Sequence, residues 1–405
     1  HPDHFSVPTI REITSSKIFI YQATKDQKVK NWLNRQGHRV MEIDDLHQIP
    51  LGNIRIKNYC STGYDSACVF QSDNGLPFLN ANDCRLELGN TLNHIKHDFK
   101  KIGAIAMQYS YANWAGNEGD KEISLHQQAI VDEKNNYVVD KLKPKTCLLM
   151  ASFVYFSHQE NYYWNENFYL NHVVDNLKSF SSNTKTIVPM IDQIFDLSNL
   201  SENEIAPNNI EALNFWSDRH YSAPIKFHTK SIEQLETLKV EYFKFFDRVS
   251  SRNTLLEKIR SKSVDDILSL KIFLSDIQKK IKISLLYKDF NINEEDESKN
   301  LSEYDVSMTS ETFVFLMKND FARGTININS RISFNYQYAY KYFFFFLAPY
   351  SNNIGKYYHD PDQFIYDLRN VQRTSIMLSI LHFNVKAAEN FDSSLNSLVS
   401  ILNSP

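Results

Sequence analysis

The chain has 405 residues, which is long for a single hydrophobic core and suits two domains. Hydrophobic residues make up 42% and charged residues 23%, the ordinary balance of a soluble globular protein. A net charge of -4 gives no electrostatic argument for a nucleic-acid partner, and neither glycine-rich nucleotide-binding motif occurs in the sequence.

The number of cysteines and the length of the apolar runs indicate the cellular compartment of the protein. Four cysteines occur, none of them in a CxxC pair, and they are too few for a disulfide framework. We therefore expect a reducing, cytoplasmic setting. The longest apolar run, 343–347, is far too short to span a bilayer. The first residue, His1, already belongs to a functional motif, so we expect further residues upstream of it.

The first 200 residues predict alternating strands and helices. Short apolar or alternating segments indicate strands, and residues 27–36 have helical spacing. Asp73-Asn74-Gly75 is typical of a hairpin turn between two strands. The expected strands are 17–21, 38–43, 54–57, 67–70, 77–80, 102–107 and 147–151. Functional side chains gather at the ends of such strands in layered α/β folds, so we expect a site there.

The second half predicts a different organisation. Residues 201–210 are polar and contain Pro207, which indicates a boundary, and helical spacing follows over about 231–288. Beyond an acidic linker, the expected strands are 304–308, 324–329 and 332–334, around a short helix at 311–317, before helix returns at 360–402. We therefore expect two domains, 1–205 and 206–405, the second a mostly helical α+β domain.

His1-Pro2-Asp3-His4 places two imidazoles and a carboxylate on one tight loop. Side chains that close can reach metal ions a few ångströms apart, and these ligand types suit Zn²⁺ or non-haem iron. Taken alone, the motif is also explained by a surface histidine or by the remnant of a purification tag.

Two later strands end in further candidate ligands. Asp83 follows the apolar strand 79–82, where a carboxylate could bridge two cations and orient a metal-bound water. The commoner use of an Asp after a strand is to cap the next segment. His158 follows the strand that begins at Cys147, and it is either one more ligand or part of a helix start capped by Ser157.

Together these three segments resemble the metallo-β-lactamase superfamily, whose signature is HxHxDH, a later His, a strand-end Asp and a final His. The likeness covers about residues 1–180. Within this superfamily, the sequence is most similar to the branch that contains CMP-N-acetylneuraminate hydroxylase and UlaG-like hydrolases. The segments that carry this similarity are 64–67, 79–84, 108–112 and 151–158. The resemblance implies an αββα sandwich whose first strands, with the first His of the motif, would lie upstream of His1.

When the family's site is carried over residue by residue, the resemblance implies a divalent-metal cofactor. Zinc is the leading choice, with iron or manganese as alternatives. The implied ligands are His1, Asp3, His4, Asp83 and His158. Asp3 and Asp83 would also be catalytic, Asp3 as a base that orients water where it is not a ligand. The family's middle His has no counterpart, because the equivalent stretch 57–64 contains no imidazole. The number of metal ions in the site, one or two, therefore stays open.

Substrate contacts are expected from two segments. Tyr109 and Trp114 follow a buried strand and could line a pocket, although such aromatic clusters are as often core. Glu160 and Asn161 follow His158 and could contact substrate or the second ring nitrogen of a ligating histidine.

The C-terminal half offers weaker signals. Residues 310–311 and 324–331 faintly resemble sterol-carrier-like domains, with a structural cap on the first domain as the alternative. Residues 343–346 indicate a buried helix segment, and residues 359–362, which echo the metal loop, are better explained as a polar turn.

Three functions compete. The leading hypothesis is metal-dependent hydrolysis of a small-molecule substrate by an activated water. An iron-dependent oxygenase is the second, and it would need a redox partner because the Cys/His pairs of a Rieske cluster do not occur. A non-catalytic binding or scaffold protein is the third, and the missing middle His favours it. No membrane span is expected, and a homo-oligomer stays open.

Overall fold

The computed structural model describes residues 5–403, apart from 15, 25, 62–64, 110–112, 151–154, 168–182, 197–201, 223–232, 261, 263, 265 and 294–303. Two compact units divide the chain, and each is discontinuous in sequence. The first unit consists of His1–Ala112, Gln128–Tyr155 and Phe168–Pro224, and the second of Asn113–Gln127, Phe156–Asn167 and Ile225–Pro405. A domain boundary at residue 205 stays a prediction.

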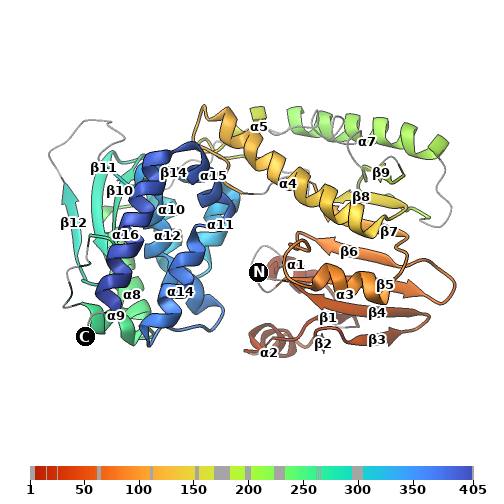
Figure 1. The fold of residues 1–405 in the computed structure, drawn as a ribbon, viewed down its shortest axis with the longest axis horizontal. Coiled ribbons are helices and arrows are strands. Elements are labelled where there is room, and N and C mark those ends of the chain that lie inside the picture. Colours follow the sequence, from red (N-terminus) through yellow and green to blue (C-terminus); the bar gives the residue numbers. More distant parts are fainter. Residues whose placement is uncertain are drawn as a thin grey trace. The chain divides into compact units, whose positions relative to one another are not determined.

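A seven-stranded sheet forms the centre of the first unit (Figure 1). In spatial order its strands are β3 (Gln48–Leu51), β4 (Ile54–Cys60), β5 (Ser66–Ser72), β6 (Phe78–Asn82), β7 (Ala104–Gln108), β8 (Thr146–Met150) and β9 (Lys185–Ile187). Neighbours from β3 to β6 are antiparallel, and those from β6 to β9 are parallel. The hairpin turn expected at Asp73-Asn74-Gly75 joins β5 to β6, which confirms that prediction.

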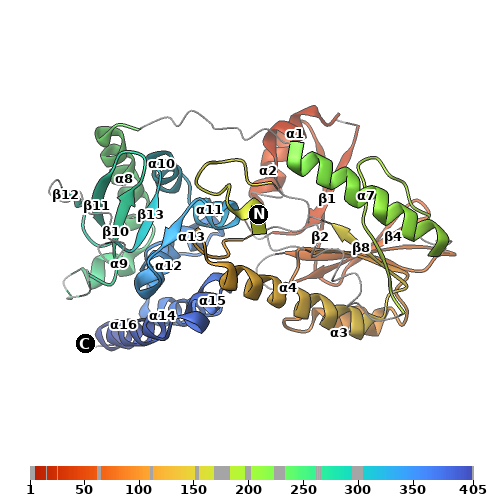
Figure 2. The same cartoon turned by 90° about the horizontal axis from the view of Figure 1, so that it is seen from above.

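A second, two-stranded sheet pairs β1 (Ile18–Gln22) with β2 (Arg39–Ile43) in parallel, and α2 (Lys28–Arg35) connects them. The unit also contains α1 (Val7–Glu12), α3 (Thr91–Asp98), α7 (Glu202–Ser222) and residues 128–142 of α4 (Lys121–Leu142). Figure 2 shows α3 and α4 on one side of the seven-stranded sheet and β1 and β2 on the other. The α/β class is confirmed, whereas a complete αββα sandwich stays a prediction.

A five-stranded sheet organises the second unit. Its order is β12 (Phe290–Asn293), β11 (Lys279–Ser284), β10 (Ser269–Leu274), β13 (Val306–Met308) and β14 (Ser333–Phe334). Only β10 and β13 are parallel among these neighbours. The helices are α5 (Trp164–Asn167), α8 (Leu235–Ser250), α9 (Thr254–Ile259), α10 (Ser310–Lys318), α11 (Ala322–Asn329), α12 (Ala339–Phe345), α13 (Leu347–Asn353), α14 (Pro361–Val371), α15 (Ser375–Phe383) and α16 (Val385–Asn403), with a 3-10 turn η3 (Tyr336–Tyr338).

Two local predictions in the second half were wrong. Residues 269–284, expected as helix, form the β10–β11 hairpin, where Leu270, Ile272 and Leu274 alternate and are buried. Residues 324–329, expected as a strand, belong to helix α11, which buries Ala322 and Ile326 four residues apart. In both cases a short pattern compatible with both periods was assigned to the wrong one. Pro207 lies inside α7, and a boundary at this point stays a prediction.

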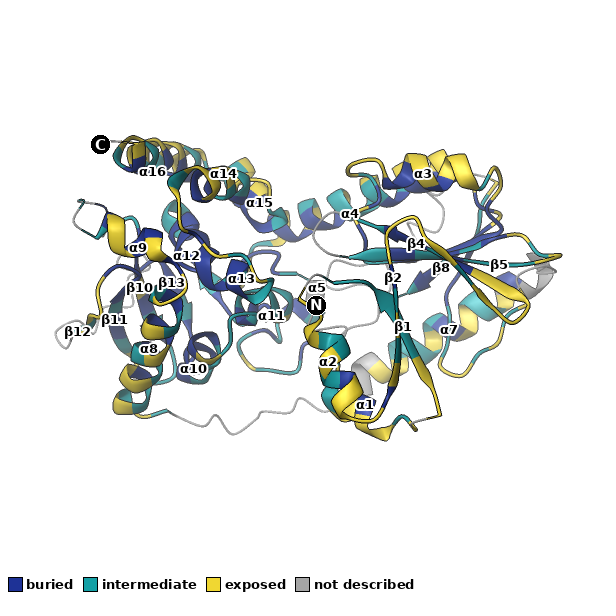
Figure 3. Cartoon of the chain, turned by 90° about the horizontal axis from the view of Figure 1, so that it is seen from below, coloured by how far each residue is buried: buried dark blue, intermediate teal, exposed yellow. Residues whose placement is uncertain are grey.

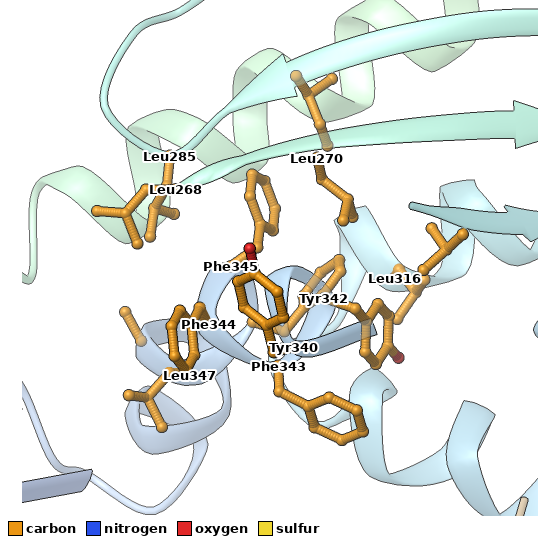
Figure 4. Packing of buried hydrophobic residues seen from close by; sticks show 14 of the residues in the cluster. Leu268, Leu270, Leu285, Leu316, Tyr340, Tyr342, Phe343, Phe344, Phe345 and Leu347 are labelled. Atoms are coloured by element: carbon orange, nitrogen blue, oxygen red, sulfur yellow. The ribbon is translucent and has the colours of Figure 1, made fainter. Parts of the chain in front are cut away.

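The buried helix expected at 343–346 is confirmed. Aromatic side chains of α12 and the residues after it meet leucines in and beside β10 and β11 (Figure 4). Leu270 lies in β10, Leu268 directly precedes β10, and Leu285 directly follows β11. The ring of Phe345 stacks on that of Phe245 from α8 at a centroid distance of 5.8 Å. Amphipathic helices complete this core, and Figure 3 shows α16 alternating between buried and exposed bands. In the described part of the chain, every helix is too short or too polar to cross a membrane.

Asp98 ties the end of α3 to β4. Its Oδ2 accepts hydrogen bonds from Lys57 Nζ at 2.6 Å and from the Tyr59 hydroxyl at 2.8 Å. Burial on its own would raise the pKa of Asp98, but hydrogen bonds from Lys57, Tyr59 and His97 and the charge of Lys57 lower it to about 2. The folded state therefore binds this proton more weakly than the unfolded chain does.

We expect Asp98→Asn to lower the free energy of unfolding of the first unit by about 1–2 kcal/mol at pH 7. Because the folded pKa lies below the ordinary value of 3.8, the stabilisation is complete above about pH 4 and is lost as the pH falls toward 2. Urea titrations at several pH values measure this loss. Asp98→Asn should not show this loss of stability at low pH, whereas Asp140→Asn, at an exposed position of α4, should show it as the unaltered chain does. Identical pH profiles for all three proteins would contradict the role assigned to Asp98.

Gly103 precedes β7 where the chain passes close to the β5–β6 connection. A Cβ at this position would lie 2.7 Å from Leu76 Cβ and 3.3 Å from the Pro77 carbonyl oxygen. We expect Gly103→Ala to destabilise the protein by about 1–3 kcal/mol because neither neighbour is a flexible chain end. Gly324→Ala is the matched control: its Cβ would meet only Tyr350 Cε2, at 3.9 Å, inside a helix, so it should stabilise by about 0.5–1 kcal/mol. Equal effects of the two substitutions in a denaturant titration would refute this account.

Candidate functional site

The metal motif itself, His1 to His4, lies outside the described residues, so its role as ligand set stays a prediction. The described chain begins directly after it. The ring of Phe5 lies 5.3 Å from that of Trp32 in α2, edge to face. Ser6 caps α1 by accepting a hydrogen bond from the backbone N–H of Thr9. The chain is thus held against the first unit within two residues of His4.

The carboxyl ends of β6, β7 and β8 form one edge of the seven-stranded sheet. These three strands are parallel, and the register pairs Asn82 with Met107 and Gln108 with Met150. Side chains that follow parallel strands emerge at the same edge, which is where layered α/β folds place their sites. We call this the carboxyl edge; Asp83 and Tyr109 are its described members that the sequence had singled out.

A bulge at the end of β6 directs the chain out of the sheet just before Asp83. Pairing with β7 passes from Asn80 to Asn82, and Asn82 has a positive φ of 51°. Asn80 Oδ1 accepts a hydrogen bond from the Asn82 N–H at 3.1 Å, which stabilises this turn. The next helix, α3, starts at Thr91 with Asn90 as its N-cap, so Asp83 does not cap it. The strand-end position predicted for Asp83 is confirmed.

Lys134 of α4 adds a positive charge to this edge. Burial lowers the pKa of Lys134, whereas the carboxylates of Glu87 and Asp83 act in the opposite direction. Glu87 is itself held by Arg85, whose Nε donates to Glu87 Oε1 at 2.8 Å. Sequence reasoning missed Lys134, because one lysine in a long polar helix carries no pattern.

Two other side chains of the edge are buried. Burial and the nearby charges of Asp65 and Asp83 raise the pKa of the Cys84 thiol, which favours its protonated form. Tyr109 is 2% exposed and packs into the hydrophobic core of the first unit. The backbone carbonyl of Gln108 accepts a hydrogen bond from Asn135 Nδ2 at 3.0 Å. A substrate contact by Tyr109 stays a prediction.

The remaining predicted residues belong to the second unit. Trp114 is fully buried, with its ring 5.0 Å from that of Phe334 and 6.0 Å from that of Tyr336. His158 begins a turn in which Asn161 Oδ1 accepts from the His158 N–H at 3.0 Å, while Asn161 Nδ2 donates to the Asn329 carbonyl at 2.6 Å. The helix that follows starts only at Trp164, so a helix start capped by Ser157 is not observed.

Glu160 is committed to an ion pair. Arg331 donates to Glu160 Oε1 at 2.8 Å and to Glu311 Oε2 at 2.7 Å, so one guanidinium links two acids from distant parts of the chain. Asn161 is likewise occupied by backbone partners. The structure therefore brings Glu160 and Asn161 together as residues that hold the 156–167 segment in the second unit. Arg331 was not recognised as their partner, because no local spacing links it to Glu160.

The described residues do not by themselves form a metal centre. Within the described ranges, no group of three or more His, Cys, Asp and Glu side chains could hold a metal ion. Asp83 lies in the first unit and His158 in the second, so a shared metal between them stays a prediction. The carboxyl edge provides one carboxylate, Asp83, with its Oδ1 covered from solvent. That donor is of the type that completes an imidazole-rich site for zinc or iron.

No protein-family model and no curated protein matches the chain. Among solved structures, a diiron beta-hydroxylase, CmlA from Streptomyces venezuelae, is 11% identical, with a TM-score of 0.33 over 46% of this chain and 42% of that one. A variant of CmlA gives 11% identity, a TM-score of 0.29 and coverages of 42% and 37%. A structure described as a possible metal-dependent hydrolase from Veillonella parvula DSM 2008 gives 13% identity, a TM-score of 0.30 and coverages of 48% and 71%. The chain thus spans less than half of the hydroxylase chains, and scores this low establish neither fold nor activity.

We expect Arg331→Met to destabilise the second unit by about 1–3 kcal/mol, because it leaves the largely buried carboxylate of Glu160 without its partner. The control is Lys244→Met, which removes an exposed pair with Glu241 and should cost less than about 0.5 kcal/mol. Denaturant titration followed by tryptophan fluorescence compares the two. Equal, small costs would show that Arg331 does not hold the segment.

Proposed function

We propose that the chain is a metal-dependent enzyme of the metallo-β-lactamase type that hydrolyses a small-molecule substrate. Its metal would be held by His1, Asp3 and His4 together with Asp83, and by His158 where the two units permit it. The observation that carries the proposal is the position of Asp83, the first residue after β6, beside two further parallel strand ends. This is where the resemblance at the level of sequence requires the carboxylate to be.

The chemistry of the donors fits such a centre. Imidazole and carboxylate side chains favour zinc, and when bound the metal would supply Lewis acidity and an activated water near neutral pH. Asp83 would orient the reacting water through its carboxylate, and Asp3, where it is not a ligand, would accept its proton. Lys134 places a positive charge near Asp83 and Glu87, which offsets the repulsion between acids gathered at this edge.

Glu160 and Asn161 take a different role in this proposal from the one expected of them. Their side chains are occupied by Arg331, by the Asn329 carbonyl and by the His158 N–H. We assign them as positioning residues that hold the turn containing His158, and we leave substrate contacts to residues of the carboxyl edge.

An iron-dependent oxygenase is the second candidate, since the same donors accept iron and the sequence resembles a hydroxylase branch. It would require a redox partner. A scaffold protein that kept the fold is the third, and the sequence 57–64, which contains no imidazole, favours it.

Metal analysis of the purified protein tests these alternatives. We expect about one or two zinc ions per chain. His4→Ala and Asp83→Asn should each lower the metal content at least about tenfold, and His94→Ala, at an exposed position of α3, should leave it unchanged. Iron in place of zinc would favour the oxygenase. A chain that binds no stoichiometric metal, or whose metal content ignores both substitutions while it remains folded, would overturn the proposal.

A further inference from the structure

Several polar side chains on α11 have buried atoms without hydrogen-bond partners among the described residues. Arg323, Asn327 and the C-cap residue Ser330 are spaced by four and three residues, which places them on one helix face. Each has a buried atom without a hydrogen-bond partner among the described residues: Nε and Nη1 of Arg323, Oδ1 of Asn327 and Oγ of Ser330. We call these three residues the polar stripe. Buried polar groups are normally satisfied, so three successive exceptions require an explanation.

Arg323 has the highest free-energy cost of burial among the three side chains. Its guanidinium lies 3.9 Å from the ring centroid of Tyr350 and 5.9 Å from that of Phe343, and it takes part in no ion pair with the described residues. Burial lowers the pKa of Arg323, while nearby tyrosines oppose the shift. Arginine nevertheless stays charged at neutral pH, so this is a covered positive charge without a counter-charge.

The tyrosine hydroxyls near Arg323 differ in whether they already have hydrogen-bond partners. Tyr358 bonds Ser351 and Asp367, and Asp367 is also paired with Lys356, so this acid is already neutralised. Tyr342, in contrast, is fully buried and its hydroxyl has no partner among the described residues. Its pKa is raised by burial and lowered by the charge of Arg323, which places the two groups in electrostatic range. The Tyr342 hydroxyl is therefore a second available donor.

The polar stripe is covered but is not sealed inside the core. Arg323, Asn327 and Tyr350 are each only half-buried as whole residues. Beside Arg323, a Cβ on Gly324 would meet nothing nearer than Tyr350 Cε2, at 3.9 Å. The helix surface next to the guanidinium therefore accepts a methyl group at ordinary van der Waals distance, whereas a Cβ at Gly103 would clash.

We propose that the polar stripe, with Tyr342 and Tyr350, binds a small polar molecule that carries an oxyanion. The carboxylate or phosphate group would lie against Arg323 and the Tyr342 hydroxyl. Polar groups of the same molecule would meet Asn327, about 6 Å along the helix, and Ser330, about 10 Å along it. A planar guanidinium stacked on an aromatic ring is suited to bind such groups. An ordered water could satisfy the hydrogen bonds but would leave the charge uncompensated. This site is independent of the proposed metal centre.

Binding of simple oxyanions to the full-length chain tests the site. Sodium phosphate and sodium acetate are titrated against sodium chloride at equal ionic strength, and thermal unfolding and amide hydrogen exchange of residues 322–353 are followed. We expect a saturable rise of the unfolding midpoint by roughly 3–6 °C at ten times the Kd, together with slower exchange in this segment. A response to phosphate alone or to acetate alone would support the proposal and identify the anionic group.

Three variants make the test specific. Arg323→Met should abolish the saturable response while the protein remains folded without added anion, because an apolar side chain replaces an unpaired charge. Tyr342→Phe should weaken binding about fivefold to tenfold. Arg373→Met, which removes an exposed arginine, should respond as the unaltered chain does. If Arg323→Met responds like the unaltered chain, the effect is a general surface one; if no oxyanion gives a saturable response, water fills the site. Either result overturns the proposal.

Discussion

The parallel pairing of β6, β7 and β8 decides which side chains can share a site in the first unit. Because the three strands run in the same direction, the residues that follow them emerge together, and the bulge from Asn80 to Asn82 turns Asp83 out of the ladder at that edge. The antiparallel strands β3 to β5 cannot do this, since their neighbours end at opposite edges. Topology thus gives Lys134 a common environment with Asp83 and the buried Cys84, although Lys134 is distant from both in sequence.

Asparagine side chains hydrogen-bond the backbone at the edge strands of both larger sheets. At β9, Asn209 accepts from the Val188 N–H and donates to the Thr186 carbonyl, at 2.9 and 2.8 Å. At β14, Asn117 bonds both the N–H and the carbonyl of Phe334, each at 2.9 Å. Each amide occupies the place of a missing strand, which satisfies edge groups that would otherwise invite pairing with another chain. In the second unit this contact also fastens the segment 113–127 to the five-stranded sheet.

Sequence patterns predicted the first unit well because its strands are short, apolar and separated by clear turn signals such as Asp73-Asn74-Gly75. The same reasoning failed at 269–284 and at 324–329, where isoleucine and leucine positions fit both a helix and a strand, and tertiary packing selects between them. The strand-end place of Asp83 followed from sequence. The partners of Glu160, and the roles of Lys134 and Arg323, did not, because each depends on residues brought together only by the fold.

Anomalous diffraction from crystals of the zinc-loaded protein tests the central claim most directly. A zinc ion held as proposed would give a peak about 2.0–2.2 Å from the Asp83 carboxylate, with imidazole nitrogens of His1 and His4 at about 2.0–2.1 Å. A zinc peak bound elsewhere, with the Asp83 carboxylate outside its ligand shell, would contradict the account.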